Sequence, residues 1–161
     1  MPQGQPGSTG WPARTASIRR AAGRLCLAMG WTPLHEVALP NGRRADILAL
    51  RPDGGFACIE VKSGVRDFLS DAKWPDYREF CDALLFAVDA DFPQDLLPAE
   101  VGVIVACGGV ADLLRLPPSH PVPPARRRAL LLRFARLAAA RLAAAEDPLG
   151  VAELRAALLV E

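Results

Sequence analysis

Residues 43–62 read RRADILALRPDGGFACIEVK. Two apolar runs flank a Pro-Asp-Gly-Gly sequence, which predicts a β-hairpin whose turn covers residues 51–55. Three charged side chains interrupt these runs: Asp46 in the first, and Glu60 and Lys62 in the second. Charged side chains are rarely buried unless they are paired. This stretch therefore predicts a sheet and, on one face of it, a candidate site.

The spacing of this hairpin sets two carboxylates against each other. Pairing of Leu50 with Phe56 across the turn places Asp46 opposite Glu60. Directly opposed residues of an antiparallel pair project from the same face, with Cβ atoms about 4.5–5.5 Å apart. Carboxylates at this separation repel each other unless a proton or a cation lies between them.

The second strand of the hairpin alternates charged and apolar side chains. Glu60 and Lys62 share one face, while Ile59 and Val61 point into the core. A Mg²⁺ or Mn²⁺ ion suits the carboxylate pair because hard cations prefer oxygen ligands and retain water. Lys62 beside such an ion is placed to orient or deprotonate a water, or to neutralise charge on a phosphate. Glu36, on the preceding strand, is placed to add a third carboxylate.

The alternative interpretation of these charges is structural. Single acidic residues in strands are often solvated at a sheet edge, and Glu60 and Lys62 then form a surface ion pair of little consequence. The position of both acids within runs of Ile, Val, Leu and Ala favours the metal site.

Composition limits the class of protein. A chain of 161 residues with 51% hydrophobic and 23% charged residues suggests one globular domain. The formal net charge of +1 gives no global attraction to nucleic acid, so any basic surface must arise from local clustering. No apolar run has the length of a membrane span, and the N-terminus lacks a signal-peptide core. The four cysteines stand singly in apolar segments and have no C-x-x-C spacing: Cys26, Cys58, Cys81 and Cys107. They are predicted to be reduced residues of the core in a cytoplasmic protein, and no zinc site is expected.

The N-terminal third contains an arm, a helix and a first hairpin. Residues 1–13 are rich in Gly, Pro, Gln and Ser and are predicted to be disordered, which leaves a single domain over 14–161. Helical periodicity predicts a helix from about Ser17 to Met29. The Asn-Gly dipeptide at 41–42 predicts a hairpin turn before the second strand.

The remaining elements indicate a crossover and further strands. Residues 66–83 read as two short helical pieces divided by Pro75. Apolar runs at 84–89 and 101–107 predict further buried strands, and 110–116 is a candidate sixth strand. A long helix is expected from near Pro124 and a short one over 151–160. Because a helical crossover joins parallel strands, we expect an α/β fold with a mixed sheet flanked by helices.

Two motifs resemble a known family. RRAD…IEVK resembles the bipartite motif of the PD-(D/E)XK nuclease superfamily, with Ala45 where the name has proline. The run 59–106 resembles the MmcB family of bacterial DNA-repair proteins, most specifically in its Asp-Phe, Lys-Trp-Pro-x-Tyr and Cys-Asp signature. Both the N-terminal helix and the basic C-terminal helix take part in the likeness. The chain departs from the family pattern at Gly64, commonly a serine, and at Cys107, commonly an acid.

This resemblance implies a restriction-endonuclease-like core and a role in DNA repair. It implies that Asp46 and Glu60 bind the metal with the carbonyl of Val61, and that Lys62 is the catalytic lysine. Glu36 is the less certain third acid, because its place in the motif varies between families. The implied partners are DNA and, with it, translesion-synthesis or other repair proteins.

Residues that could hold DNA phosphates are basic or hydroxyl-bearing and lie near the expected site or at a helix start. These candidates are Arg19, Arg20, Arg43, Arg44, Ser63, Lys73, Arg126, Arg127 and Arg128. The last three equally suit a solvated cluster, and Ser63 equally suits a strand end. A wall that faces the substrate beside the metal could be formed by Asp67, Asp71, Lys73, Trp74, Asp76 and Tyr77. Trp74 and Tyr77 suit core anchors with polar tips somewhat better than base stacking.

The leading hypothesis is therefore a metal-dependent endonuclease that acts on damaged or structured DNA. The alternative is a non-catalytic DNA-binding or scaffold protein that retains the nuclease fold. A nuclease that acts on RNA is a third possibility, since nothing in the sequence is specific to either nucleic acid.

Overall fold

The computed structural model describes residues 10–159. The chain divides into two compact units, one that ends at Val122 and one that begins at Pro123. Residues 1–9 of the predicted N-terminal arm lie outside the described residues. The single domain over 14–161 stays a prediction.

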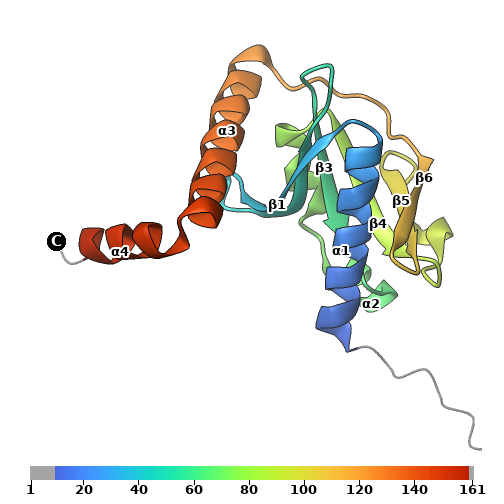
Figure 1. The fold of residues 1–161 in the computed structure, drawn as a ribbon. Helices are drawn as coiled ribbons and strands as arrows, with labels where there is room; N and C mark the ends of the chain where they lie inside the picture. The colour runs from blue at the N-terminus through green and yellow to red at the C-terminus, as the bar shows by residue number, and fades with distance from the viewer. Residues whose placement is uncertain (1–9, 160–161) are drawn as a thin grey trace, which may run out of the picture. The chain divides into compact units, whose positions relative to one another are not determined.

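A six-stranded mixed sheet forms the first unit (Figure 1). Its strands follow each other in chain order, from β1 at one edge to β6 at the other. The first three strands are antiparallel, β3 runs parallel to β4 and β4 to β5, and β6 returns antiparallel. The expected α/β fold and the parallel crossover are confirmed. The strands are β1 (Thr32–Ala38), β2 (Arg44–Leu50), β3 (Phe56–Val61), β4 (Ala83–Asp89), β5 (Gly102–Cys107) and β6 (Val110–Arg115).

The β2–β3 hairpin has the predicted register. Leu50 pairs with Phe56 and, at the other end of the ladder, Ile47 pairs with Ile59. The turn closes through the Arg51 N–H, which donates to the Gly55 carbonyl at 2.8 Å. Since side chains alternate along each strand, Ile59 faces the same side as Ile47, and Glu60 faces the other side.

Helix α1 (Trp11–Ala28) covers one face of the sheet. It begins six residues before the predicted Ser17. Pro12 lies in its first turn, where proline is favoured because backbone N–H groups at that position have no acceptor within the helix. Its buried face packs on alternate residues of the central strands. The core on this face contains Ile18, Ala21, Ala22, Cys26, Ile47, Ala49, Ala57, Ile59, Val61, Ala83, Leu85, Ala87, Ile104 and Ala106.

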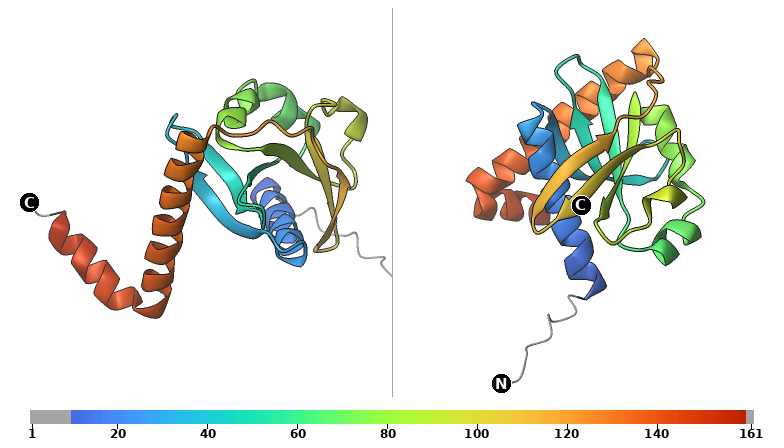
Figure 2. Two further views of the ribbon diagram at one scale, coloured as in Figure 1. Left: turned by 90° about the horizontal axis from the view of Figure 1, so that it is seen from above. Right: turned by 90° about the vertical axis from the view of Figure 1, so that its right-hand side faces the viewer.

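The crossover from β3 to β4 covers the opposite face (Figure 2, left). It contains α2 (Val65–Ser70) and the 3₁₀ helix η1 (Trp74–Phe80), so the prediction of two helical pieces is confirmed. The break lies at residues 71–73, ahead of Pro75, which stands in the first turn of η1. Phe68 and Trp74 pack edge-on against Phe86 of β4, with ring centroids 5.5 and 5.6 Å apart. A short 3₁₀ helix, η2 (Gln94–Leu96), lies between β4 and β5.

The second unit contains α3 (Pro124–Glu146) and α4 (Pro148–Leu158). The start of α3 agrees with the prediction. Helix α4 begins three residues earlier than predicted because Asp147 caps it, accepting the Gly150 N–H at 3.1 Å. Val160, the predicted last helical residue, lies outside the described residues. Within residues 10–159 no helix is long and apolar enough to cross a membrane.

The cysteines are unbridged. Cys26, Cys58 and Cys81 are buried, as predicted. Cys107 is exposed, which contradicts the prediction of a core residue. It is the last residue of β5, and the Gly108-Gly109 turn that follows carries it out of the apolar layer.

Candidate functional site

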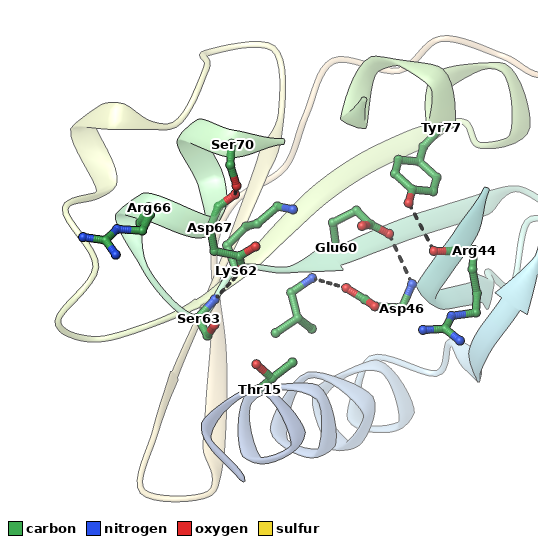
Figure 3. A pocket seen from close by; sticks show the side chains of 11 residues that line it. Thr15, Arg44, Asp46, Glu60, Lys62, Ser63, Arg66, Asp67, Ser70 and Tyr77 are labelled. Carbon is green, nitrogen blue, oxygen red and sulfur yellow. Dashed lines mark hydrogen bonds between the residues drawn. The ribbon is translucent and has the colours of Figure 1, made fainter. Parts of the chain in front are cut away.

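A cavity of about 720 Å³ lies at the ends of β2 and β3, in the first unit (Figure 3). It is bounded by α1 on one side and by α2 and η1 on the other. Its walls carry both acidic and basic groups. The lining residues are Thr15, Arg44, Asp46, Glu60, Val61, Lys62, Ser63, Arg66, Asp67, Ser70 and Tyr77.

The carboxylates of Asp46 and Glu60 meet across the two strands beyond the last backbone pair. The Asp46 N–H donates to Glu60 Oε1 at 3.2 Å, and the Val61 N–H donates to Asp46 Oδ2 at 2.8 Å. Each carboxylate thus binds the backbone of the opposite strand, which holds both side chains in place. The structure brings together the two acids that the sequence predicted to be opposed.

This carboxylate pair does not ionise freely. Burial, and then the neighbouring charge of Asp46, raises the pKa of Glu60 to about 8. Burial also raises the pKa of Asp46, although the Val61 N–H and the charge of Lys62 act against that rise. A cation between the carboxylates would offset both effects, because it favours the ionised form of each.

Lys62 follows β3 directly and is buried, with 6% of its side chain exposed. Lys62 nevertheless lines the cavity, beside the end of β3. Its backbone N–H continues the pairing with β4 by donating to the Ala87 carbonyl at 2.9 Å, which holds the residue within the sheet. Its ammonium donates to Asp71 Oδ2 at 2.5 Å.

Glu36 lies apart from the cavity lining. Its backbone has φ of 50°, in the left-handed region, which interrupts the alternation of β1 between the paired residues His35 and Val37. The exposed carboxylate forms ion pairs with Arg19 at 3.2 Å and Arg44 at 3.8 Å. The role of third acid for Glu36 stays a prediction, and the ion pairs give its charge other partners.

The predicted phosphate-binding residues are dispersed. Arg44 and Ser63 line the cavity, whereas Arg43 makes a two-hydrogen-bond contact with Asp76 at 3.0 and 2.8 Å. Arg20 and Lys73 are exposed. Arg126, Arg127 and Arg128 begin α3 and belong to the second unit.

Three cavity residues were not predicted from the sequence: Thr15, Arg66 and Ser70. Thr15 belongs to α1, in the stretch where no helix was predicted. Arg66 and Ser70 belong to α2 and have no spacing relation to the strand motif, so only the packing of α2 brings them here. Tyr77 is buried as a core anchor, and its hydroxyl, which donates to the Arg44 carbonyl at 3.1 Å, lies at the cavity wall.

The donor set suits a hard cation held by few protein ligands. Within residues 10–159 no group of three or more His, Cys, Asp or Glu side chains is placed to hold a metal ion. The hydrogen bonds described above use Asp46 Oδ2 and Glu60 Oε1, which leaves the second oxygen of each carboxyl and the Val61 carbonyl as candidate ligands. Mg²⁺ is commonly bound by one or two carboxylates together with water and substrate phosphates, so the residues present fit such an ion.

Comparison with solved structures gives a close match. The SPO1766 protein of unknown function from Silicibacter pomeroyi has a TM-score of 0.80 and 40% sequence identity to this chain. The match covers 84% of this chain and 92% of that protein. Among curated proteins, none matches this chain.

The family comparison covers most of the sequence, including the sheet, the cavity and α3. Residues 5–149 match the model of the family described as DNA repair protein MmcB-like, and the chain therefore belongs to that family.

Proposed function

We propose that this protein acts in DNA repair through a PD-(D/E)XK-type site that hydrolyses DNA phosphodiesters with Mg²⁺ or Mn²⁺. The observation that carries the proposal is the convergence of Asp46, Glu60 and Lys62 on one cavity. Membership of the DNA repair protein MmcB-like family supports DNA as the substrate. The mixed sheet with helices on both faces is consistent with the core of that nuclease superfamily.

Each residue of the site has a defined task in this proposal. Asp46 and Glu60, with the Val61 carbonyl, hold the cation on the face of the sheet that carries Lys62. The bound cation supplies Lewis acidity and lowers the pKa of a coordinated water. Lys62 provides a fixed positive charge that stabilises the negative charge developing on the phosphate in the transition state. The exposed Arg44 and Arg66, on the cavity wall, are placed to hold flanking phosphates.

A cleavage assay with Lys62→Met tests the proposal. Met retains the apolar stem of Lys62 and removes only its ammonium, so packing beside β3 is largely preserved. We expect the variant to cut branched, nicked or single-stranded DNA on the order of 10²–10³-fold more slowly than the wild type in Mg²⁺ or Mn²⁺. Arg155→Met, which removes an exposed positive charge of α4, is the control and should cleave normally. Absence of cleavage by the wild type on every DNA contradicts the proposal.

A second candidate is a DNA-binding or scaffold protein without catalysis. The ion pair of Lys62 with Asp71 favours it, because the ammonium already has a carboxylate partner. This candidate predicts that Lys62→Met complements a deletion strain fully after DNA damage. The nuclease proposal predicts loss of survival with the same variant.

Repair proteins, including those of translesion synthesis, are the partners we propose, and the cytoplasm is the proposed location. Substitution of RNA for DNA in the cleavage panel tests the third candidate. Preferential cutting of RNA would replace DNA as the substrate while leaving the assigned chemistry in place.

A further inference from the structure

The only charged group in hydrogen-bond contact with the Lys62 ammonium, among the interactions described for residues 10–159, is Asp71. Lys62 Nζ and Asp71 Oδ2 are 2.5 Å apart, and their side chains are 6% and 19% exposed. Ion pairs with so little water are screened weakly, so this contact restrains the position of Lys62 strongly. Asp71 lies directly after α2, nine residues away from Lys62 in the chain.

The surrounding structure holds Asp71 in place. Its Oδ1 accepts the Lys73 N–H at 2.9 Å, and its own N–H donates to the Phe68 carbonyl at 3.2 Å. The Phe68 ring packs against Phe86 and Phe92, with centroids 5.5 and 6.1 Å apart. The carboxylate that faces Lys62 is thus anchored to the apolar layer between the crossover and the sheet.

Lys62 has a second possible partner close by. Glu60 lies two residues before it and projects from the same face of β3 (Figure 3). The charge of Lys62 opposes the rise in the pKa of both Asp46 and Glu60, since it favours the ionised form of each carboxyl. A Lys62 ammonium released from Asp71 can therefore bind this carboxylate pair, and would there occupy the position of a divalent cation.

We infer that Asp71 is a positioning residue that holds the Lys62 ammonium away from the Asp46–Glu60 pair and so keeps that pair available to a divalent cation. The inference rests on the proposed function, since it assigns the pair to the metal. In this role the Lys62–Asp71 ion pair belongs to the site, which accounts for the contact between the Asp71 carboxylate, after α2, and the Lys62 ammonium.

Calorimetric titration of the full-length, metal-free protein with Mn²⁺ tests this inference. We expect Asp71→Asn to weaken Mn²⁺ binding about tenfold or more, since a nearby cation changes the proton affinity of a carboxylate by about 1–3 pKa units. Asp71→Glu, which retains the charge, should restore most of the affinity. In Lys62→Met/Asp71→Asn the competing ammonium is absent, so Mn²⁺ binding should return to at least the wild-type level.

The double variant separates positioning from mere structure. A loss of affinity in Asp71→Asn that persists in Lys62→Met/Asp71→Asn would overturn the inference, because Asp71 would then act on the fold and not through Lys62. Equal Mn²⁺ titrations of the wild type and Asp71→Asn, including no binding by either, would overturn it as well.

A measurement on the wild type alone covers the case in which Asp71→Asn fails to fold. The chain has two lysines, Lys62 and Lys73, so lysine labelled with ¹⁵N at Nζ gives two signals. We expect the Lys62 ammonium hydrogens to exchange slowly with water because Asp71 binds them, whereas those of the exposed Lys73 exchange rapidly. Equally rapid exchange at both lysines would overturn the inference.

Failure of this inference and failure of the proposed function give different results. Mn²⁺ binding that follows the expected pattern without DNA cleavage retains the role of Asp71 and removes the nuclease. Cleavage by the wild type together with unaltered Mn²⁺ binding by Asp71→Asn retains the nuclease and removes the role of Asp71.

Discussion

At the scale of single residues, the Glu60 carboxyl lies where burial and a neighbouring charge both oppose its ionised form. Its side chain is buried, and its pKa is raised from 4.5 to about 8. The metal-free protein therefore holds a proton on Glu60 over most of the physiological range. Because a metal ligand must lose this proton, binding of Mg²⁺ or Mn²⁺ is coupled to pH.

The first prediction concerns stability and pH in the absence of metal. A carboxyl whose pKa is raised in the folded state stabilises the fold fully below its ordinary pKa, and this stabilisation is lost as pH rises toward the folded pKa. For Glu60 the window is about pH 4.5 to 8. We expect the free energy of unfolding to fall across that window, by about 1.4 kcal/mol for each unit of pKa shift. Glu60→Gln should show a much flatter profile.

Urea unfolding in EDTA at pH 5, 7 and 9 measures this effect. Glu100→Gln is the control, because the Glu100 side chain is 55% exposed and pairs with Arg78 only at 3.9 Å. Parallel pH profiles for wild type and Glu60→Gln would contradict the assignment of the raised pKa to Glu60.

The second prediction concerns Asp46 as a metal ligand. Asp46→Ala removes one of two carboxylates and the acceptor of the Val61 N–H, so Mn²⁺ binding by calorimetry should be lost. Asp67→Asn changes another acid of the same cavity, one that accepts the Ser63 N–H at 3.3 Å, and should bind Mn²⁺ nearly as the wild type does. Equal binding by wild type and Asp46→Ala would remove this carboxylate from the site.

At the scale of elements, one buried acid joins three segments that are distant in sequence. Asp82, just before β4, accepts the Phe56 N–H at 2.7 Å and the Val122 N–H at 2.9 Å with its two carboxylate oxygens. Its own carbonyl accepts the His120 N–H at 3.1 Å. These contacts tie the start of β3 to β4 and to the segment that follows β6.

The third prediction is that Asp82→Ala destabilises the protein strongly. It leaves two buried backbone N–H groups without their acceptor, and a hydrogen bond to a charged group contributes about 1.5–3 kcal/mol. We expect a loss of about 3 kcal/mol or more in urea unfolding. Asp91→Ala is the control, since that side chain is 91% exposed, and it should change stability little. If Asp82→Ala lowered the free energy of unfolding no more than Asp91→Ala does, Asp82 would not be needed to hold these three segments together.

At the scale of the whole molecule, the basic residues are unevenly distributed. Residues 123–161 carry seven arginines and four acidic residues, whereas residues 1–122 carry twelve basic and fourteen acidic residues. Arg126, Arg127 and Arg128 lie near the start of α3, and the first turn of this helix has no acidic residue. Positive charge at a helix N-terminus is repelled by the positive end of the helix macrodipole, and a bound anion such as a DNA phosphate would offset this repulsion.

The fourth prediction is that these arginines contribute to DNA affinity without setting sequence preference. Replacement of all three by Gln should weaken binding and reduce the slope of log affinity against log salt by about 0.9 for each phosphate that the protein no longer neutralises. Arg155→Gln, in α4, is the control. Fluorescence anisotropy from 50 to 300 mM salt measures the slope, and an unchanged slope would mean that the three arginines only face solvent.

Local pattern by itself determined much of the fold and the centre of the site. The two-residue period of strands and the turn at residues 51–55 define the β2–β3 register, because a slip of β3 by one residue would move Ile59 out of the core beneath α1 and bring the charged Glu60 into it. The same period places Glu60 and Lys62 on one face. The helical segment between two buried apolar runs requires the parallel pairing of β3 with β4.

Only the tertiary structure decided what each of these charges contacts. The partner of Lys62 is Asp71, and the partners of Glu36 are Arg19 and Arg44. These contacts depend on where α1 and α2 pack on the sheet, and on a left-handed backbone at Glu36 that no local pattern signals. The periodicity of apolar residues indicates which face of a helix or strand a side chain occupies, because that face follows from backbone geometry alone. It does not record which group meets that side chain across a packed interface, because that depends on the combined packing of elements distant in sequence.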